Sequence, residues 1–151
     1  MDTINSKILE CLSHNARMNA SEIADNVKLS VSAVIERIKK LEADGTIVGY
    51  FAELSPAKLG KDVTALILVT VEHPKFNEGF LKAIKQHPSI IECYYIAGDY
   101  DYVLKVVTES TKSLELTLND IKRIEGVSKT KTNIVLSAFK DDNSVLLQKL
   151  N

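Results

Sequence analysis

The chain has 151 residues, of which 45% are hydrophobic and 26% are charged, and its formal net charge is −1. These values are typical of a globular protein with one domain or two small ones, and they exclude a strongly basic protein whose charge alone drives DNA binding. Any basic surface must therefore arise from cations gathered on one face, and we expect DNA binding to need a dimer or a larger assembly.

The composition and the motifs of the chain disfavour several other classes of protein. The first residues include Asp2 and Glu10 and no long apolar run, so we expect no signal peptide, and no segment approaches the roughly 18 apolar residues of a membrane span. Cys11 and Cys93 belong to no C-x-x-C pair, which predicts two buried thiols in a reducing cytoplasm. The three histidines have no ligand or catalytic spacing, so we expect no metal, no cofactor and no enzymatic activity.

The first half of the chain contains three amphipathic segments. Asp2 or Thr3 can cap a first helix that ends near residues 13–15. Asn19 and Glu22 have the spacing of a capping box and predict a short second helix. Only residues 28–30 separate it from a third helix, and two helices joined by so short a link must cross steeply, as in a helix-turn-helix.

The third segment is the candidate recognition helix. Ser30 can cap it, and Gly45 ends it. Small residues lead its outward face and the cations Arg37, Lys39 and Lys40 follow, which suits the DNA major groove because small side chains allow close approach and arginine can bond guanine. A solvated surface helix is the alternative, and the helix-turn-helix context favours DNA. The expected inner face of this helix is formed by Val31, Val34, Ile35, Ile38 and Leu41.

The composition changes after Gly45, and we expect the domain boundary between residues 50 and 62. The segment Thr46–Leu54 is β-branched and aromatic and predicts a strand that leaves the helical domain. We therefore expect a helix-turn-helix domain in residues 1–50, a linker in 51–61, a second domain in 62–140 and a C-terminal tail in 141–151.

The second half predicts a β-α-β-β-α-β order. Val63–Val71 is a nearly continuous apolar run, typical of a strand buried on both faces. This order places both helices on one face of a four-stranded sheet, and we expect a second copy of the chain to cover the other face. The remaining expected elements are a helix from Pro74 to before Pro88, strands at 90–97 and 102–107, a helix at 111–124 and a last strand at 130–139.

A loop rich in Gly and Asp separates the two middle strands. Gly98 permits close approach of a ligand to the backbone, Asp99 and Asp101 can meet an ammonium group, and Tyr100 and Tyr102 can wall a small pocket. A hairpin turn is the alternative, because Gly and Asp are also the usual turn residues, and the residues alone favour the turn.

The ordered set of motifs resembles the Lrp/AsnC (feast/famine) transcriptional regulators over nearly the whole chain. The resemblance implies an α+β protein with an N-terminal three-helix helix-turn-helix domain, a strand linker and a C-terminal ferredoxin-like (ACT-like) domain. The motifs on which this resemblance rests are Asn15-Ala-Arg17, Glu22-Ile-Ala24, Leu29-Ser30, Glu36-Arg37-Ile38, Leu41-Glu42, Gly45-Thr-Ile47, Gly49-Tyr50, Leu59-Gly60, Gly98-Asp99-Tyr100-Asp101, Gly126-Val127 and Thr130-Lys131-Thr132.

Functional residues follow from the resemblance position by position. Asn119 lies where some lysine-binding relatives have an acid, which disfavours a basic effector, and Lys28 departs from the Gly common in the inter-helix turn. The DNA-binding residues implied are Ser30, Ser32, Ala33, Glu36, Arg37 and Lys40. The effector-binding residues implied are Gly98, Asp99, Tyr100, Asp101, Tyr102, Asn119, Thr130 and Thr132.

The resemblance implies a regulator of transcription whose partners are double-stranded DNA, further copies of the chain in dimers and often octamers, and a small effector. That effector is expected to be an amino acid bound between subunits, and no membrane partner is expected. Two alternatives stay open. One is an architectural DNA-binding protein with little effector response, and the other is a stand-alone amino-acid sensor whose first sixty residues have no DNA role.

Overall fold

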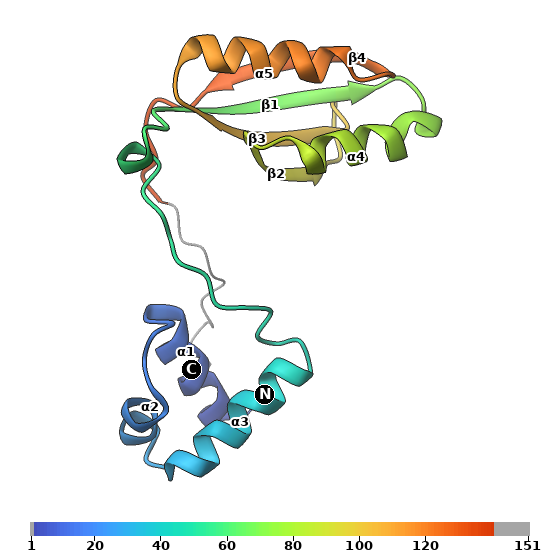
Figure 1. Ribbon diagram of the computed structural model, residues 1–151. Coiled ribbons are helices and arrows are strands. Elements are labelled where there is room, and N and C mark those ends of the chain that lie inside the picture. Colours follow the sequence, from blue (N-terminus) through green and yellow to red (C-terminus); the bar gives the residue numbers. More distant parts are fainter. Residues whose placement is uncertain (1, 141–151) are drawn as a thin grey trace. The chain divides into compact units, whose positions relative to one another are not determined.

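The computed structural model describes residues 2–140, which form two compact units, one built on residues 2–53 and the other on Leu54–Phe139 (Figure 1). The expected C-terminal tail at 141–151 lies outside the described residues. No helix within the described part of the chain is both long and apolar enough to cross a membrane.

The first unit contains the three expected helices. Their N-caps are the residues that the sequence predicts, and both hydrogen bonds of the Asn19–Glu22 capping box are present. The helices are α1 (Thr3–His14), α2 (Ala20–Val27) and α3 (Val31–Ala43), capped by Asp2, Asn19 and Ser30.

The core of this unit covers only a narrow strip of α3. Val34 and Leu41 are buried, but Val31 and Ile35, expected on the same inner face, are 42% and 41% exposed. Successive residues lie about 100° apart round a helix, so Ile35 falls beyond the strip that α1 and α2 cover. The buried residues of this core are Ile8, Ile23, Ala24, Val27, Val34 and Leu41.

The expected strand at Thr46–Leu54 is wrong for this structure. Residues 46–56 contain no strand, and Val48 and Phe51 are 87% and 81% exposed. A strand requires a neighbour that completes its hydrogen bonds, and no described segment lies in that place.

The second unit has the β-α-β-β-α-β order that the sequence predicts. All neighbouring strands are antiparallel, and the four-stranded sheet has the order β2-β3-β1-β4. Short 3₁₀ helices at Ala57–Leu59 and Pro74–Phe76 precede β1 and α4. The elements are β1 (Val63–Val71), α4 (Asn77–Gln86), β2 (Ile90–Tyr95), β3 (Tyr102–Thr108), α5 (Thr111–Arg123) and β4 (Val127–Ile134).

The bounds of two strands differ from those expected. β2 ends at Tyr95 rather than 97, and β4 begins at Val127 and ends at Ile134 rather than spanning 130–139. β4 pairs only with β1, from Val71 opposite Val127 to Ala65 opposite Ile134, so its first residue lies opposite the end of β1.

The core of the second unit lies on one face of the sheet. Ala65, Ile67 and Val69 of β1 are fully buried with residues of α4 and α5, whereas Leu66, which points to the other face, is 39% exposed. The expectation that β1 is buried on both faces is therefore wrong within a single chain, because the helices cover only one side. Cys11 and Cys93 are free thiols and are half-buried rather than fully buried.

Candidate DNA-binding surface and effector site

The turn between α2 and α3 sets the direction of α3. The backbone N–H groups of Lys28 and Leu29 both donate to the carbonyl oxygen of Ala24, which closes the end of α2. Lys28 adopts the left-handed conformation, with φ 59° and ψ 46°, and the chain then enters the Ser30 cap. Figure 1 shows that α2 and α3 run in different directions on the two sides of this turn.

The outward face of α3 carries most of the predicted DNA-binding residues. Ser32, Glu36 and Lys40 are exposed, Ala33 is half-buried, and the Ser30 hydroxyl accepts from the Ala33 N–H at 3.3 Å. The Lys40 ammonium lies 3.0 Å from the Glu36 carboxylate, and this bond lowers the Glu36 pKa below its usual range. Exposed ion pairs of this kind are weak, so a DNA phosphate can replace the carboxylate.

Arg37 does not project from this face. Its guanidinium Nη1 lies 2.6 Å from Asp2 Oδ2 and 2.8 Å from Asn5 Oδ1, and its side chain is 31% exposed. Arg37 follows the buried Val34 by one helical turn, which places it on the flank of α3 that meets the start of α1. The expectation that Arg37 faces outward is therefore wrong in this structure, and its hydrogen bonds instead tie α3 to α1.

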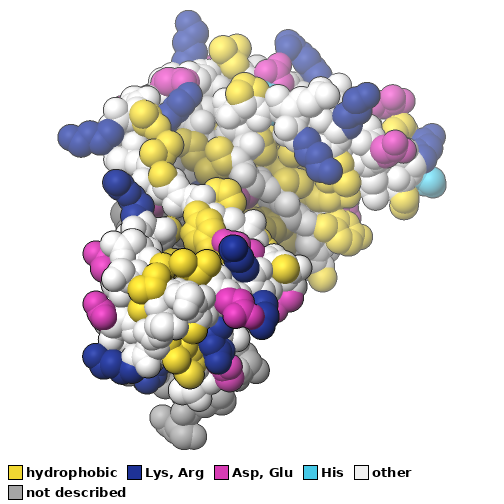
Figure 2. Space-filling view, turned by 60° about the horizontal axis from the view of Figure 1, so that its bottom comes forward, with side chains coloured by type: hydrophobic (Ala, Val, Ile, Leu, Met, Phe, Trp, Pro, Cys, Tyr) yellow, Lys and Arg dark blue, Asp and Glu magenta, His cyan; other side chains and the backbone are white. Residues whose placement is uncertain are grey.

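The charged side chains of this unit form individual ion pairs and no broad basic patch on the face in view. Figure 2 shows Lys and Arg side chains interspersed with Asp and Glu on the face in view, rather than gathered into one broad patch. A backbone N–H donated by Asn5, and next the Arg37 guanidinium, lower the pKa of Asp2, so the carboxylate that holds Arg37 stays charged at neutral pH.

A second contact, which the sequence does not predict, joins the residues that follow α3 to the helix. The Tyr50 hydroxyl donates to Glu42 Oε1 at 2.8 Å, and burial together with this bond raises the pKa of Tyr50 to about 12. The motif Gly49-Tyr50 contributes only to the family resemblance, and the pairing depends on how the chain turns back along α3.

The loop between β2 and β3 is anchored by Asp101. Its Oδ2 accepts from the Val71 N–H at 2.9 Å, and its own N–H donates to the Val69 carbonyl oxygen at 3.0 Å. Gly98 has φ 142°, a conformation that favours glycine. The predicted loop is thus held by Asp101 to the end of β1, and its Gly98 backbone carries no side chain that would obstruct a ligand.

A cavity of about 520 Å³ lies beside this loop. Tyr102 is buried, with its ring 4.8 Å from Phe80 and 5.2 Å from Tyr95, and it forms one wall. The residues that line the rest of the cavity were not predicted, although the alternation along β2 places Cys93 and Tyr95 on the same face of that strand. The lining residues are Asn77, Leu81, Cys93, Tyr95 and Tyr102, none of which is charged at neutral pH.

Of the three remaining predicted effector residues, only Thr130 lies at the loop end of the sheet. Thr130 pairs with Val69, whose partner on the other side is Tyr102, so Thr130 lies at the same end of the sheet as the loop. Thr132 lies further along β4, opposite Ile67. Asn119 is exposed on α5, and no hydrogen bond or ion pair joins it to the loop within residues 2–140.

Two further loop residues remain accessible to a ligand. Asp99 is exposed, and Tyr100 is half-buried with the Lys129 ammonium 4.9 Å from the centre of its ring. The exposed carboxylate of Asp99 is available to an incoming ammonium group.

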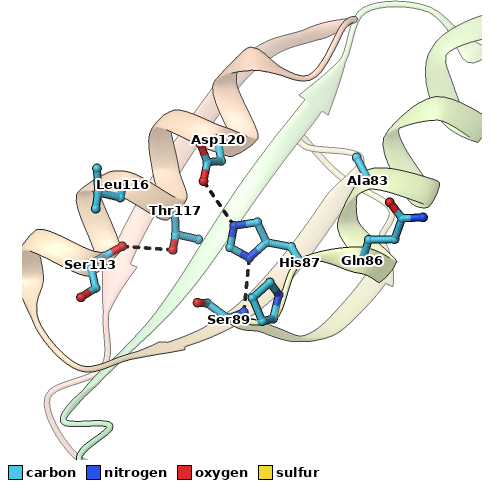
Figure 3. A pocket seen from close by; sticks show the side chains of 9 residues that line it. Ala83, Gln86, His87, Ser89, Ser113, Leu116, Thr117 and Asp120 are labelled. Carbon is cyan, nitrogen blue, oxygen red and sulfur yellow. Dashed lines mark hydrogen bonds and ion pairs between the residues drawn. The ribbon is translucent and has the colours of Figure 1, made fainter.

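A second hollow, of about 600 Å³, lies between the end of α4 and α5 (Figure 3). His87 Nε2 lies 3.5 Å from Asp120 Oδ2, and His87 Nδ1 accepts from the Ser89 N–H at 3.3 Å. Neighbouring groups within the unit therefore occupy both nitrogens of this ring, and none of the predicted site residues lines the hollow. The described residues contain no cluster of three or more His, Cys, Asp or Glu that could hold a metal ion.

Two family models match the chain, a winged helix-turn-helix DNA-binding model over residues 1–48 and the Lrp/AsnC ligand binding domain over residues 64–145. The chain belongs to the Lrp/AsnC family. It is 37% identical over 141 residues to the HTH-type transcriptional regulator FL11 of Pyrococcus furiosus, covering 93% of each chain. It is 32% identical over 151 residues to the leucine-responsive regulatory protein of Haemophilus influenzae, covering 98% of this chain and 91% of the relative.

Solved Lrp/AsnC structures share the fold. A transcriptional regulator of Neisseria meningitidis in complex with L-methionine aligns with a TM-score of 0.92 at 27% identity over 96% of both chains. The feast or famine regulatory protein of M. tuberculosis complexed with L-methionine aligns with a TM-score of 0.90 at 30% identity, over 97% of this chain and 99% of that one. This Lrp/AsnC member is thus a DNA-binding transcriptional regulator with a ligand-binding domain, and not an enzyme.

Proposed function

We propose that this Lrp/AsnC regulator binds a small amino acid with an uncharged, apolar side chain in the cavity beside the 98–102 loop. The composition of that cavity carries the proposal: leucine, cysteine and two tyrosines surround one amide, with no charged group at neutral pH. The loop adds an exposed carboxylate, Asp99, for the ammonium group. Two relatives that were solved with L-methionine support an effector of this chemistry.

We propose that DNA lies against the exposed side of α3, at Ser30, Ser32, Ala33, Glu36 and Lys40. Arg37 acts in this interface indirectly, because its hydrogen bonds to Asp2 and Asn5 hold α3 against α1. A helix that enters the major groove by its N-terminal residues must be held at a fixed angle, so loss of this anchor weakens binding without removing a DNA contact.

Assembly of the regulator begins with the open face of the sheet. Leu66 and Leu68 of β1 and Val103 of β3 alternate with the buried core residues, so they share this uncovered face. A second copy that covers the face gives a dimer with two recognition helices, which suits a pseudo-palindromic site with half-sites roughly 34 to 36 Å apart. An octamer of four such dimers is the larger assembly that we propose, and an effector bound between subunits shifts its stability.

Thermal shift and calorimetry test the effector proposal. L-Methionine or L-leucine should raise the Tm of the full chain, while L-lysine and D-methionine should not. Tyr95→Ala removes a cavity wall and should abolish the shift, whereas Ile91→Ala, on the same strand but outside the cavity lining, should preserve it. A Tm shift with L-lysine and none with L-methionine would refute the apolar pocket.

A further inference from the structure

The backbone at Lys28 is unusual in this structure. Lys28 is the single residue other than glycine with a positive φ within residues 2–140. An L-residue is strained in this left-handed conformation because its Cβ crowds the following carbonyl oxygen, whereas glycine adopts it freely. The chain therefore keeps a lysine at a position where glycine would be more stable.

The fold itself does not use the Lys28 side chain. The turn is closed by backbone hydrogen bonds to Ala24, and the neighbouring Val27 is buried in the core. The Lys28 side chain is exposed, and its ammonium makes no hydrogen bond or ion pair with any of the described residues. Lys7, Arg17 and Lys39 of the same unit likewise form no ion pair with the described residues, so what distinguishes Lys28 is its left-handed backbone. Packing and ion pairing therefore give no reason for a lysine here.

The position of Lys28 in the helix-turn-helix does give a reason. It lies two residues before the Ser30 cap, where α3 begins. In a bound helix-turn-helix the second helix enters the major groove while the first crosses the backbone, so the connecting turn passes beside the phosphates at the edge of the groove. A long, unpaired ammonium group at this point can reach a phosphate oxygen.

We propose that Lys28 is a phosphate-contacting residue of the DNA interface, and that the chain tolerates the left-handed lysine because of this contact. The inference rests on the proposed function of α3 as the recognition helix. The ligand is the sugar–phosphate backbone, so the contact raises affinity for all duplexes without selecting a sequence. Each phosphate contact of this kind adds one increment to the salt-dependent attraction to DNA.

Replacing Lys28 separates strain from binding, because the two effects have opposite signs. For Lys28→Gly we expect a Tm higher by a few degrees, with affinity for a random-sequence duplex of roughly 40 base pairs about three- to tenfold weaker near 0.1 M salt. The slope of log affinity against log salt should fall by about one for each bound subunit. Lys28→Arg should keep the affinity and the slope, and Lys82→Gln, an exposed lysine of α4, is the charge-matched control.

Fluorescence anisotropy across a salt series and calorimetry on the full-length variants give the readout. A stabilised Lys28→Gly with the affinity and salt slope of the wild type would overturn the inference, as would equal losses in Lys28→Gly and Lys82→Gln. A Lys28→Gly that is less stable than the wild type would overturn its premise. If α3 variants such as Ser32→Glu leave duplex binding unchanged, the recognition-helix proposal itself fails, and this result is distinct from a failure at Lys28 alone.

Discussion

Removal of the Asp101 carboxylate tests the link between the loop and the effector. In Asp101→Ala the half-buried N–H of Val71 loses its acceptor at 2.9 Å. A buried donor left without a partner costs about 1–3 kcal/mol, and a domain of this size loses roughly 4–8 °C in Tm per kcal/mol. We therefore expect a measurable destabilisation of the ligand-binding unit.

The same loss should weaken effector binding. If L-methionine binds only when the 98–102 loop is held to the end of β1, a cost of about 1–3 kcal/mol corresponds to roughly 5- to 150-fold weaker apparent affinity. DNA affinity measured without the effector should stay at the level of the wild type, because Asp101 lies in the second unit and α3 in the first.

Isothermal titration with L-methionine and anisotropy with DNA measure the two effects separately. Asp101→Asn keeps an acceptor oxygen for the Val71 N–H but removes the charge, so it separates anchoring of the loop from attraction of the ammonium group. Wild-type affinity for L-methionine in Asp101→Ala would refute the reasoning, since it would mean that the loop does not need its anchor.

Arg37→Ala should lower the Tm and weaken DNA binding, whereas Arg37→Lys, which keeps a cationic donor for Asp2, should retain part of both, and unchanged affinity in Arg37→Ala would contradict an anchoring role. Because the pKa of Asp2 lies below its ordinary 3.8, its contribution is complete above that pH and disappears as the pH falls through the lowered value, so wild type and Arg37→Ala should converge in Tm in acid. Tyr50 should ionise near pH 12, and its contribution to stability, complete below pH 10, should disappear as the pH rises through 12; the difference in phenolate absorbance between the wild type and Tyr50→Phe measures this. Gly126→Ala should lower the free energy of unfolding by about 2–4 kcal/mol, because Gly126 has φ 86° and an added Cβ would collide with the Phe76 side chain. A melting curve equal to that of the wild type would show that the turn rearranges without this cost.

Local chemistry explains which parts of the fold could be predicted from the sequence. The caps at Asp2, Asn19 and Ser30 define helix starts through bonds to residues three positions on, so the sequence alone contains both partners. The expected strand at Thr46–Leu54 failed because a strand needs a neighbour, and β propensity does not say whether one is present. The prediction that Arg37 faces outward was wrong for a related reason, because the direction of its side chain depends on where the start of α1 lies in space.

The candidate effector site shows the same division. The Gly98–Tyr102 loop could be identified because its residues are contiguous and their chemistry is distinctive. Asn77 and Leu81 could not, since they reach the cavity only through the packing of α4 beside β2 and β3. The anchoring role of Asp101 was also missed, because its partner Val71 lies 30 positions away in the chain.

The side chains of β1 alternate between positions that the core constrains and positions that it does not. Odd-numbered positions such as Ala65 and Ile67 are fixed by the interior of the unit, whereas Leu66 and Leu68 can change without disturbing it. If the even-numbered positions form the dimer interface that we propose, duplicated genes in one cell can diverge there alone and produce regulators that no longer form mixed dimers, while each retains its fold.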